Sequence, residues 1–124
     1  MRQRSSLLAT AVSMAALLGS MVMTASAPVS AADASVIEEG KKLAFDRKMG
    51  NCLACHQIEG GELAGNIGPP LVAMKARYPD KAKLRAQIWD ATEANPNTIM
   101  PPFGRHKIVS DTDIDKIVEF IYTL

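Results

Sequence analysis

The stretch NCLACH, residues 51–56, holds both cysteines of the chain two residues apart and a histidine directly after the second. Three kinds of site use thiols this close together: a redox-active dithiol, half of a zinc site, and a covalent haem attachment. A disulfide between them would close only a tiny loop and would stabilise a fold very little. The chemistry of this hexapeptide therefore decides what the rest of the chain can build.

The first two kinds of site lack supporting residues. A thioredoxin-type dithiol lies between a strand and a helix, and the chain shows no alternating strand pattern of useful length. Zinc needs four ligands, but beyond the hexapeptide only His106 is available, and the adjacent Cys55 and His56 are poor simultaneous zinc ligands.

Cys-x-x-Cys-His is the attachment signature of haem c. Thiols at this spacing reach the two vinyl groups on one edge of a porphyrin and form thioethers. The residue after the second thiol then lies beneath the ring, where its imidazole can bind the iron. We therefore predict one covalent haem c attached through Cys52 and Cys55, with His56 as an axial metal ligand.

An electron-carrying haem needs a second axial ligand from the other side of the ring. The candidates are Met49, Met74, Met100 and His106. Met49 is too close to the attachment site to cross the ring, and Met74 falls in a predicted helix, where it is more simply a core residue. Met100 stands in TIMPPFG, whose prolines restrict the backbone and can hold a loop against the iron. We predict Met100 as the second metal ligand, with His106 as the alternative.

Two further features are candidates for haem contacts. In GPPL, residues 68–71, the carbonyl of one of the prolines can accept the Nδ1–H of His56 and fix the ring. An ordinary rigid turn is the alternative. Trp89 can donate its indole N–H to a haem propionate, although at its helical spacing it is more often a core residue.

The beginning of the chain is typical of a secretory signal peptide, with a basic start, an apolar centre and a small-residue exit. We predict a cleaved signal over residues 1–32, cut after Ala31 or Ala32, and one domain over residues 33–124. The apolar centre, residues 7–22, is shorter than the roughly 20 residues of a membrane-spanning helix. We therefore expect a periplasmic protein with no permanent membrane anchor after signal cleavage.

The charge balance gives no reason to expect a nucleic-acid partner. The chain has 14 Lys and Arg against 13 Asp and Glu, and Arg2 and Arg4 belong to the predicted signal. The mature domain is therefore close to neutral. A domain of this size buries a modest core and often needs a cofactor to hold it together.

Helical periodicity and capping residues predict a small all-α domain. The expected helices are 33–48, 71–77, 81–92 and 110–124. Gly50 is predicted as a left-handed cap after the first helix, Asp80 and Ser110 as N-caps, and Asp113 as a capping-box acid. The loops between the helices are rich in Gly and Pro, and such long loops are expected to wrap around something.

The stretches AFDRKMGNCLACH and GNIGPPL resemble class I cytochromes c. In that family the first and last helices cross through a small residue and an aromatic, and the matching residues here are Gly40 and Phe45, facing Phe120 or Tyr122. The resemblance implies the class I cytochrome c fold, with helices and long loops wrapped around one covalent haem.

The family pattern Gly-Pro-x-Leu after the haem motif is matched here by Gly68, Pro69 and Leu71. In the family the proline carbonyl accepts from the haem-ligand histidine. The resemblance therefore implies that Pro69 is the acceptor of the Nδ1–H of His56.

More narrowly, the two stretches AFDRKMGNCLACH and GNIGPPL together with LRAQIWDATEANPNTIMPPFGRH and IVEFIYTL resemble the family of monohaem SoxX subunits of SoxAX complexes in bacterial sulfur oxidation. This resemblance implies a periplasmic heterodimer with a SoxA cytochrome subunit, an L-cysteine S-thiosulfotransferase that joins thiosulfate to a cysteine of the carrier SoxYZ. The subunit's haem, ligated here by His56 and Met100, passes the released electrons to an electron-accepting cytochrome c. No catalytic residue is expected on this chain. The alternative is a free-standing soluble monohaem cytochrome c that shuttles electrons between other oxidoreductases.

Overall fold

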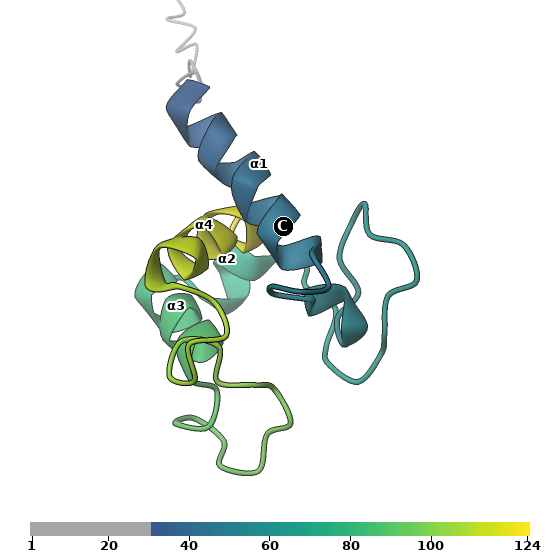
Figure 1. Ribbon diagram of the computed structural model, residues 1–124, viewed down its shortest axis with the longest axis vertical. Helices are drawn as coiled ribbons and strands as arrows, with labels where there is room; N and C mark the ends of the chain where they lie inside the picture. Colours follow the sequence, from purple (N-terminus) through teal and green to yellow (C-terminus); the bar gives the residue numbers. More distant parts are fainter. Residues whose placement is uncertain (1–30) are drawn as a thin grey trace, which may run out of the picture.

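The computed structural model describes residues 31–124, so the predicted signal peptide lies almost wholly outside the described residues and stays a prediction. The described part is helical and contains no β-strand, which confirms the all-α prediction. Its elements are α1 (Ala31–Phe45), the 3₁₀ turn η1 (Cys52–Ala54), α2 (Met74–Arg77), α3 (Lys81–Trp89) and α4 (Asp111–Ile121). In Figure 1 two long loops, drawn in teal and in green, leave the helices on different sides. None of the described helices is long and apolar enough to cross a membrane.

The first and last helices cross through a glycine, as the family resemblance implies. A Cβ added to Gly40 of α1 would lie 1.9 Å from the carbonyl oxygen of Lys116 in α4. Beside this contact the rings of Phe45 and Phe120 meet edge to face, with centroids 5.8 Å apart. Phe120 is therefore the aromatic partner, whereas the hydroxyl of Tyr122 donates to a carbonyl in the α2–α3 connection.

Helix α4 begins as predicted. The Ser110 Oγ accepts from the backbone N–H of Asp113 at 3.2 Å, which confirms Ser110 as the N-cap. The same hydroxyl donates to the Asp113 carboxylate at 2.7 Å, so this shorter acid meets the capping hydroxyl itself. The apolar face of α4 is buried and forms much of the core, through Ile114, Ile117, Val118, Phe120 and Ile121.

Helix α1 ends at Phe45, three residues before the predicted end. The chain doubles back at this point, and the Gly50 N–H donates to the Leu43 carbonyl at 3.1 Å. A Cβ on Gly50 would lie 2.9 Å from that same oxygen. The predicted left-handed cap at Gly50 is wrong: the left-handed residue is Asn51, with a φ of 47°, and the glycine serves the close approach of two backbone segments.

Helix α2 is a single turn that begins at Met74 instead of residue 71. The residue before it, Ala73, has a left-handed backbone with a φ of 51°, which a continuing α-helix excludes. The Leu71 N–H donates to the Gln57 carbonyl at 2.9 Å. Long-range pairing therefore replaces the first turn of the predicted helix.

Helix α3 begins after Asp80, whose side chain accepts from the Ala82 N–H at 2.9 Å, as predicted for an N-cap. It ends at Trp89 instead of Thr92. The reason lies in Asp90, whose carboxylate accepts from the Thr92 N–H and thereby offers the backbone an alternative to the next helical turn.

Candidate functional site

A cavity of about 530 Å³ lies between the helices and the two long loops. Its volume falls within the range of small-molecule and cofactor sites, about 300–1,000 Å³. Helices α3 and α4 supply an aliphatic wall of Leu84, Ile88, Ile114, Ile117 and Ile121. The predicted site residues on the cavity wall are Cys52, Cys55, His56, Pro69, Leu71 and Met100.

The turn η1 presents the thiols and the imidazole to this cavity. Asn51, in its left-handed conformation, starts the turn. The N–H groups of Cys55 and His56 both donate to the Cys52 carbonyl, at 3.2 and 2.9 Å. Both cysteines are free and half-buried. The backbone of CLACH is thus folded tightly enough to place all three side chains on one wall.

The surroundings of the thiols disfavour the two alternative chemistries. Burial, with a smaller contribution from Cys55, raises the pKa of the Cys52 thiol to about 11. Redox-active thiols have the opposite property, a lowered pKa that makes the thiolate available. Among residues 31–124, moreover, no three His, Cys, Asp or Glu side chains are grouped so that they could hold a metal ion, as a zinc site would require.

The imidazole of His56 is held by a neighbouring loop. Its Nδ1 donates to the Pro69 carbonyl at 2.7 Å, which confirms the contact implied by the family pattern. A carbonyl can only accept, so the proton lies on Nδ1 and the lone pair of the neutral ring lies on Nε2. Gly68 lets the backbone approach, since a Cβ there would lie 2.4 Å from the His56 Cε1. The half-buried Leu71 completes this loop segment on the cavity wall.

The second loop brings a thioether to the same cavity. Met100 is half-buried, and its N–H donates to the Thr98 Oγ1 at 3.1 Å. Three methionines line the wall: Met49, Met74 and Met100. Met74 is 1% exposed, as expected for a core residue, and its sulfur accepts from Arg77 at 3.6 Å. His106, the alternative ligand, is exposed and lies off the cavity wall.

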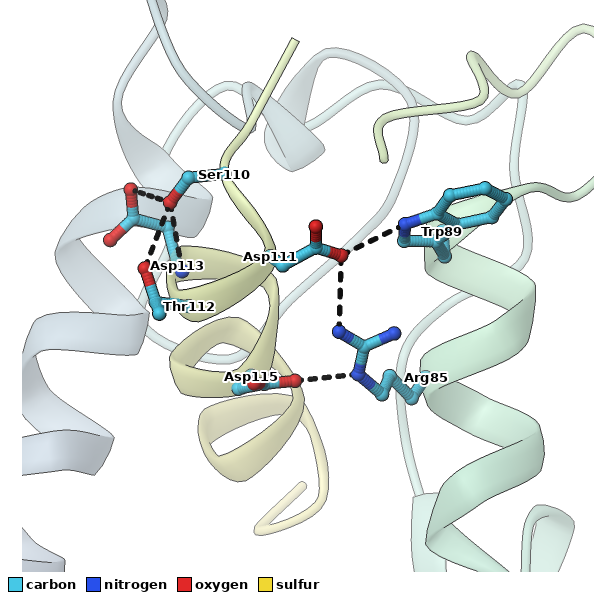
Figure 2. Close-up of polar contacts among 7 residues, drawn as sticks. All are labelled: Arg85, Trp89, Ser110, Asp111, Thr112, Asp113 and Asp115. Carbon is cyan, nitrogen blue, oxygen red and sulfur yellow. Dashed lines mark hydrogen bonds and ion pairs between the residues drawn. The ribbon is translucent and has the colours of Figure 1, made fainter. Parts of the chain in front are cut away.

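The propionate contact of Trp89 stays a prediction, and within the described residues its indole N–H has a protein partner. Its indole N–H donates to the Asp111 Oδ1 at 3.0 Å (Figure 2). Trp89 is not among the residues that line the cavity. Arg85 from the same helix donates to Asp111 at 3.2 Å and to Asp115 at 2.6 Å. Because Trp89 ends α3 beside the start of α4, its N–H is used in holding these two helices together.

Three cations on the cavity wall were missed by sequence reasoning: Arg47, Lys48 and Arg77. Arg77 donates to the Pro70 carbonyl at 2.9 Å, which ties α2 to the loop that holds His56. Cations on the rim of an apolar cavity suit a ligand that carries carboxylates, as haem does. Arg47 and Lys48 lie a few residues before the attachment motif, and that position is the sequence signal that could have indicated them.

The donor set fits a covalently attached haem. Two thiols two residues apart, an imidazole with its Nε2 free and a thioether meet in one cavity with aliphatic walls. Thiols and imidazole together on one turn can attach a porphyrin and ligate its iron, and the methionine supplies the softer ligand typical of electron-transfer haems.

Comparisons with known proteins agree with this geometry. The family model described as Cytochrome c matches residues 37–124. No curated protein matches the sequence. The crystal structure of SoxXA from P. pantotrophus is similar, with a TM-score of 0.63 and 29% identity over 69% of this chain and 79% of that chain. The chain therefore belongs to the cytochrome c family, an electron-transfer domain with covalently bound haem c.

Proposed function

We propose that this chain is a periplasmic electron-transfer subunit that carries one haem c and works in a complex with a SoxA cytochrome partner. The observation that carries the proposal is the shared cavity wall of the two thiols, the imidazole and the thioether. Cys52 and Cys55 would hold the haem through thioethers, and the His56 Nε2 and the Met100 sulfur would bind its iron.

When bound, the haem supplies a one-electron redox centre, and the chain supplies its environment. The Pro69 carbonyl fixes the His56 ring and makes it a better ligand. A thioether ligand from Met100 raises the reduction potential relative to a second histidine. The aliphatic wall from α3 and α4 keeps water away from the site, and burial is a further determinant of the potential.

Two observations support a protein partner beside the cavity. The first is the similarity to the crystal structure titled SoxXA. The second is a set of large apolar side chains left exposed in the loops. Val72 and Leu63, which do not line the main cavity, are 56 and 93% exposed. Exposed apolar groups gathered around a site are typical of docking surfaces.

Within such a complex the chain collects electrons rather than binding the sulfur substrate. Oxidative joining of thiosulfate to a cysteine of the SoxYZ carrier releases two electrons, and the catalytic chemistry belongs to the partner. Electrons pass from the partner to this haem and then to an electron-accepting cytochrome c. This assignment of roles rests on the family resemblance.

The haem assignment is tested on protein matured in the periplasm. An alkaline pyridine haemochrome spectrum should show a c-type band. Cys52→Ala and Cys55→Ala, each leaving one thioether, should shift that band, because one vinyl group then stays unsaturated. Absence of any haem band in the wild type would overturn the proposal.

The axial ligand is tested by a matched pair of variants. Met100→Ala should abolish the far-red sulfur-to-iron charge-transfer band and lower the reduction potential, because the thioether is lost. His106→Ala, a change at an exposed residue off the cavity wall, should alter neither. A band that survives Met100→Ala would exclude this ligand.

The partner is tested by purifying the native protein from the source periplasm and identifying bound chains by mass. A SoxA-type cytochrome at equal stoichiometry is the expected result. A monomer that carries haem and exchanges electrons alone would instead support the free-standing shuttle.

A further inference from the structure

A polar cluster joins the two ends of the loop that carries Met100. Asp90, 1% exposed, directly follows α3, and its Oδ2 accepts from the Arg105 Nη1 at 2.7 Å. Its Oδ1 accepts from the N–H and the hydroxyl of Thr92, at 3.0 and 2.5 Å. Arg105 also donates to the Thr92 hydroxyl at 3.3 Å. We call Asp90, Thr92 and Arg105 the loop clasp.

The backbone beside the clasp closes the same loop. The N–H groups of Gly104 and Arg105 point to the Trp89 carbonyl, at 3.0 and 3.4 Å. Gly104 also lies flat against the indole, since a Cβ there would be 1.9 Å from the Trp89 Cδ1. The indole is itself fixed by its bond to Asp111 (Figure 2). Both ends of the loop are therefore fastened to the end of α3.

Between its ends the loop makes local hydrogen bonds. The N–H groups of residues 95, 97, 98 and 100 pair with acceptors no more than four positions earlier in the chain. Ile99, beside the thioether, is 73% exposed. The middle of the loop makes only local hydrogen bonds, whereas its two ends are joined by the long-range bonds described above. The position of Met100 therefore depends on the contacts that hold the two ends of the loop together.

We propose that the loop clasp positions Met100, so that Asp90 and Arg105 set the fraction of time that the thioether is away from the iron. This inference rests on the proposed function, because it takes Met100 as the ligand. None of the three clasp side chains lines the cavity, so Asp90 and Arg105 act on Met100 through the loop.

The consequence is measurable with a competing ligand. Imidazole in solution binds the iron only when Met100 has left, so its apparent affinity is proportional to the open fraction. Removing one partner of a buried charge pair leaves the other uncompensated. Because Arg105 is half-exposed, the expected effect is modest: a rise of about tenfold in imidazole affinity for Asp90→Asn or Arg105→Gln.

The experiment titrates the ferric holoprotein with imidazole and follows the far-red charge-transfer band. Glu119→Gln is the matched control, since it removes the Lys81–Glu119 ion pair of 2.8 Å between α3 and α4 without touching the loop. The control should bind imidazole as the wild type does. Arg105→Gln leaves the Thr92 bonds to Asp90 in place, so it provides a second, milder variant that is expected to fold.

Combined variants distinguish an effect of the clasp on the position of Met100 from a general loss of stability of the protein. The double variant Asp90→Asn/Arg105→Gln should bind imidazole about as tightly as either single variant, because both changes open the same contact. In a Met100→Ala background the far-red band is absent, so imidazole binding is followed there by the shift of the main haem absorption band. Asp90→Asn should have no further effect on imidazole affinity in that background, because the competition is already gone.

The outcomes distinguish the two proposals. If the wild type lacks the band, or Met100→Ala leaves it intact, the ligand assignment in the proposed function fails. If the band depends on Met100 but the clasp variants bind imidazole like the wild type and the control, the ligand assignment stands and the positioning role is overturned. Equal effects of Asp90→Asn with and without Met100 would also overturn it.

Discussion

At the scale of single residues, His56 is held by two neighbours that act in different ways. The Pro69 carbonyl accepts its Nδ1–H, and this leaves the Nε2 lone pair for the metal. Gly68 leaves room for the imidazole, because any side chain at this position would occupy the space of the ring. The orientation of the ring thus depends on a residue that makes no polar contact with it.

We predict that Gly68→Ala destabilises the holoprotein by roughly 1–3 kcal/mol, the usual cost of overpacking. The added methyl group would lie 2.4 Å from the His56 Cε1 and must push the ring away from the Pro69 carbonyl. The reduction potential should change with it, because the basicity of the ligand depends on that bond. Urea unfolding and a redox titration check both effects, with Val72→Ala at an exposed position of the same loop as control. Wild-type values for Gly68→Ala would contradict the close contact.

Residue-level features could be predicted where the signal is local. The attachment spacing, the Pro69 acceptor and the Ser110 cap each depend on residues close in sequence or on a family pattern. The partner of Trp89 could not be predicted in this way, because an indole N–H can donate to a haem propionate or to any nearby carboxylate. Only the packing of α3 on α4 brings Asp111 within reach of it.

At the scale of elements, every predicted helix exists and most of their ends differ. N-terminal ends were predicted well where an N-cap side chain marks them, at Asp80 and Ser110. The ends at Phe45 and Trp89 are set by contacts that periodicity does not report. After Phe45 the chain folds back so that the Gly50 N–H donates to the Leu43 carbonyl of α1. After Trp89 the buried Asp90 carboxylate accepts from the backbone N–H of Thr92.

The crossing of α1 and α4 depends on the absence of a side chain at Gly40. We predict that Gly40→Val lowers the free energy of unfolding by about 3 kcal/mol or more, because a Cβ would lie 1.9 Å from the backbone oxygen of Lys116 and the helices must separate. Urea unfolding of the holoprotein measures this. Glu38→Ala, at an exposed position on the same helix, should change stability by less than about 0.5 kcal/mol. Equal stability of the two variants would contradict the crossing.

The contribution of Asp90, which joins α3 to the Met100 loop, to the free energy of unfolding should depend on pH. The Thr92 hydroxyl and the Arg105 guanidinium hold the pKa of Asp90 below its usual range, against the opposing effect of burial. The contribution of Asp90 to stability is therefore complete above its unfolded pKa of about 3.9 and is lost as the pH falls through the lower folded pKa.

We predict that the difference in unfolding free energy between the wild type and Asp90→Asn is constant above about pH 5 and shrinks below about pH 4. Urea unfolding at a series of pH values measures that difference. A difference that grows toward acid would contradict the direction of the pKa shift.

At the scale of the whole molecule, the core is built around the cavity instead of filling it. The aliphatic residues of α3 and α4 that would normally meet another layer of side chains face a space of about 530 Å³. A domain of this size has a total stability of only about 5–15 kcal/mol. Leaving a cavity of this volume without its haem would cost a free energy of the same order.

We therefore predict that Cys52→Ala/Cys55→Ala, exported without covalent haem, lacks the cooperative unfolding transition of the wild type. The thiols hold the ligand that completes the core, and without it the two loops have nothing to wrap. Far-UV circular dichroism during thermal unfolding checks this. A sharp transition in haem-free protein would show that the helices form a sufficient core alone.

The crossing of α1 with α4 also has a consequence for assembly. The cysteines follow closely after α1, whereas α4, which closes against Gly40, is the last helix of the chain. The contact at Gly40 therefore joins the helix that precedes the attachment motif to the last helix of the described residues. Covalent attachment of the haem and closure of the domain thus involve neighbouring parts of the chain.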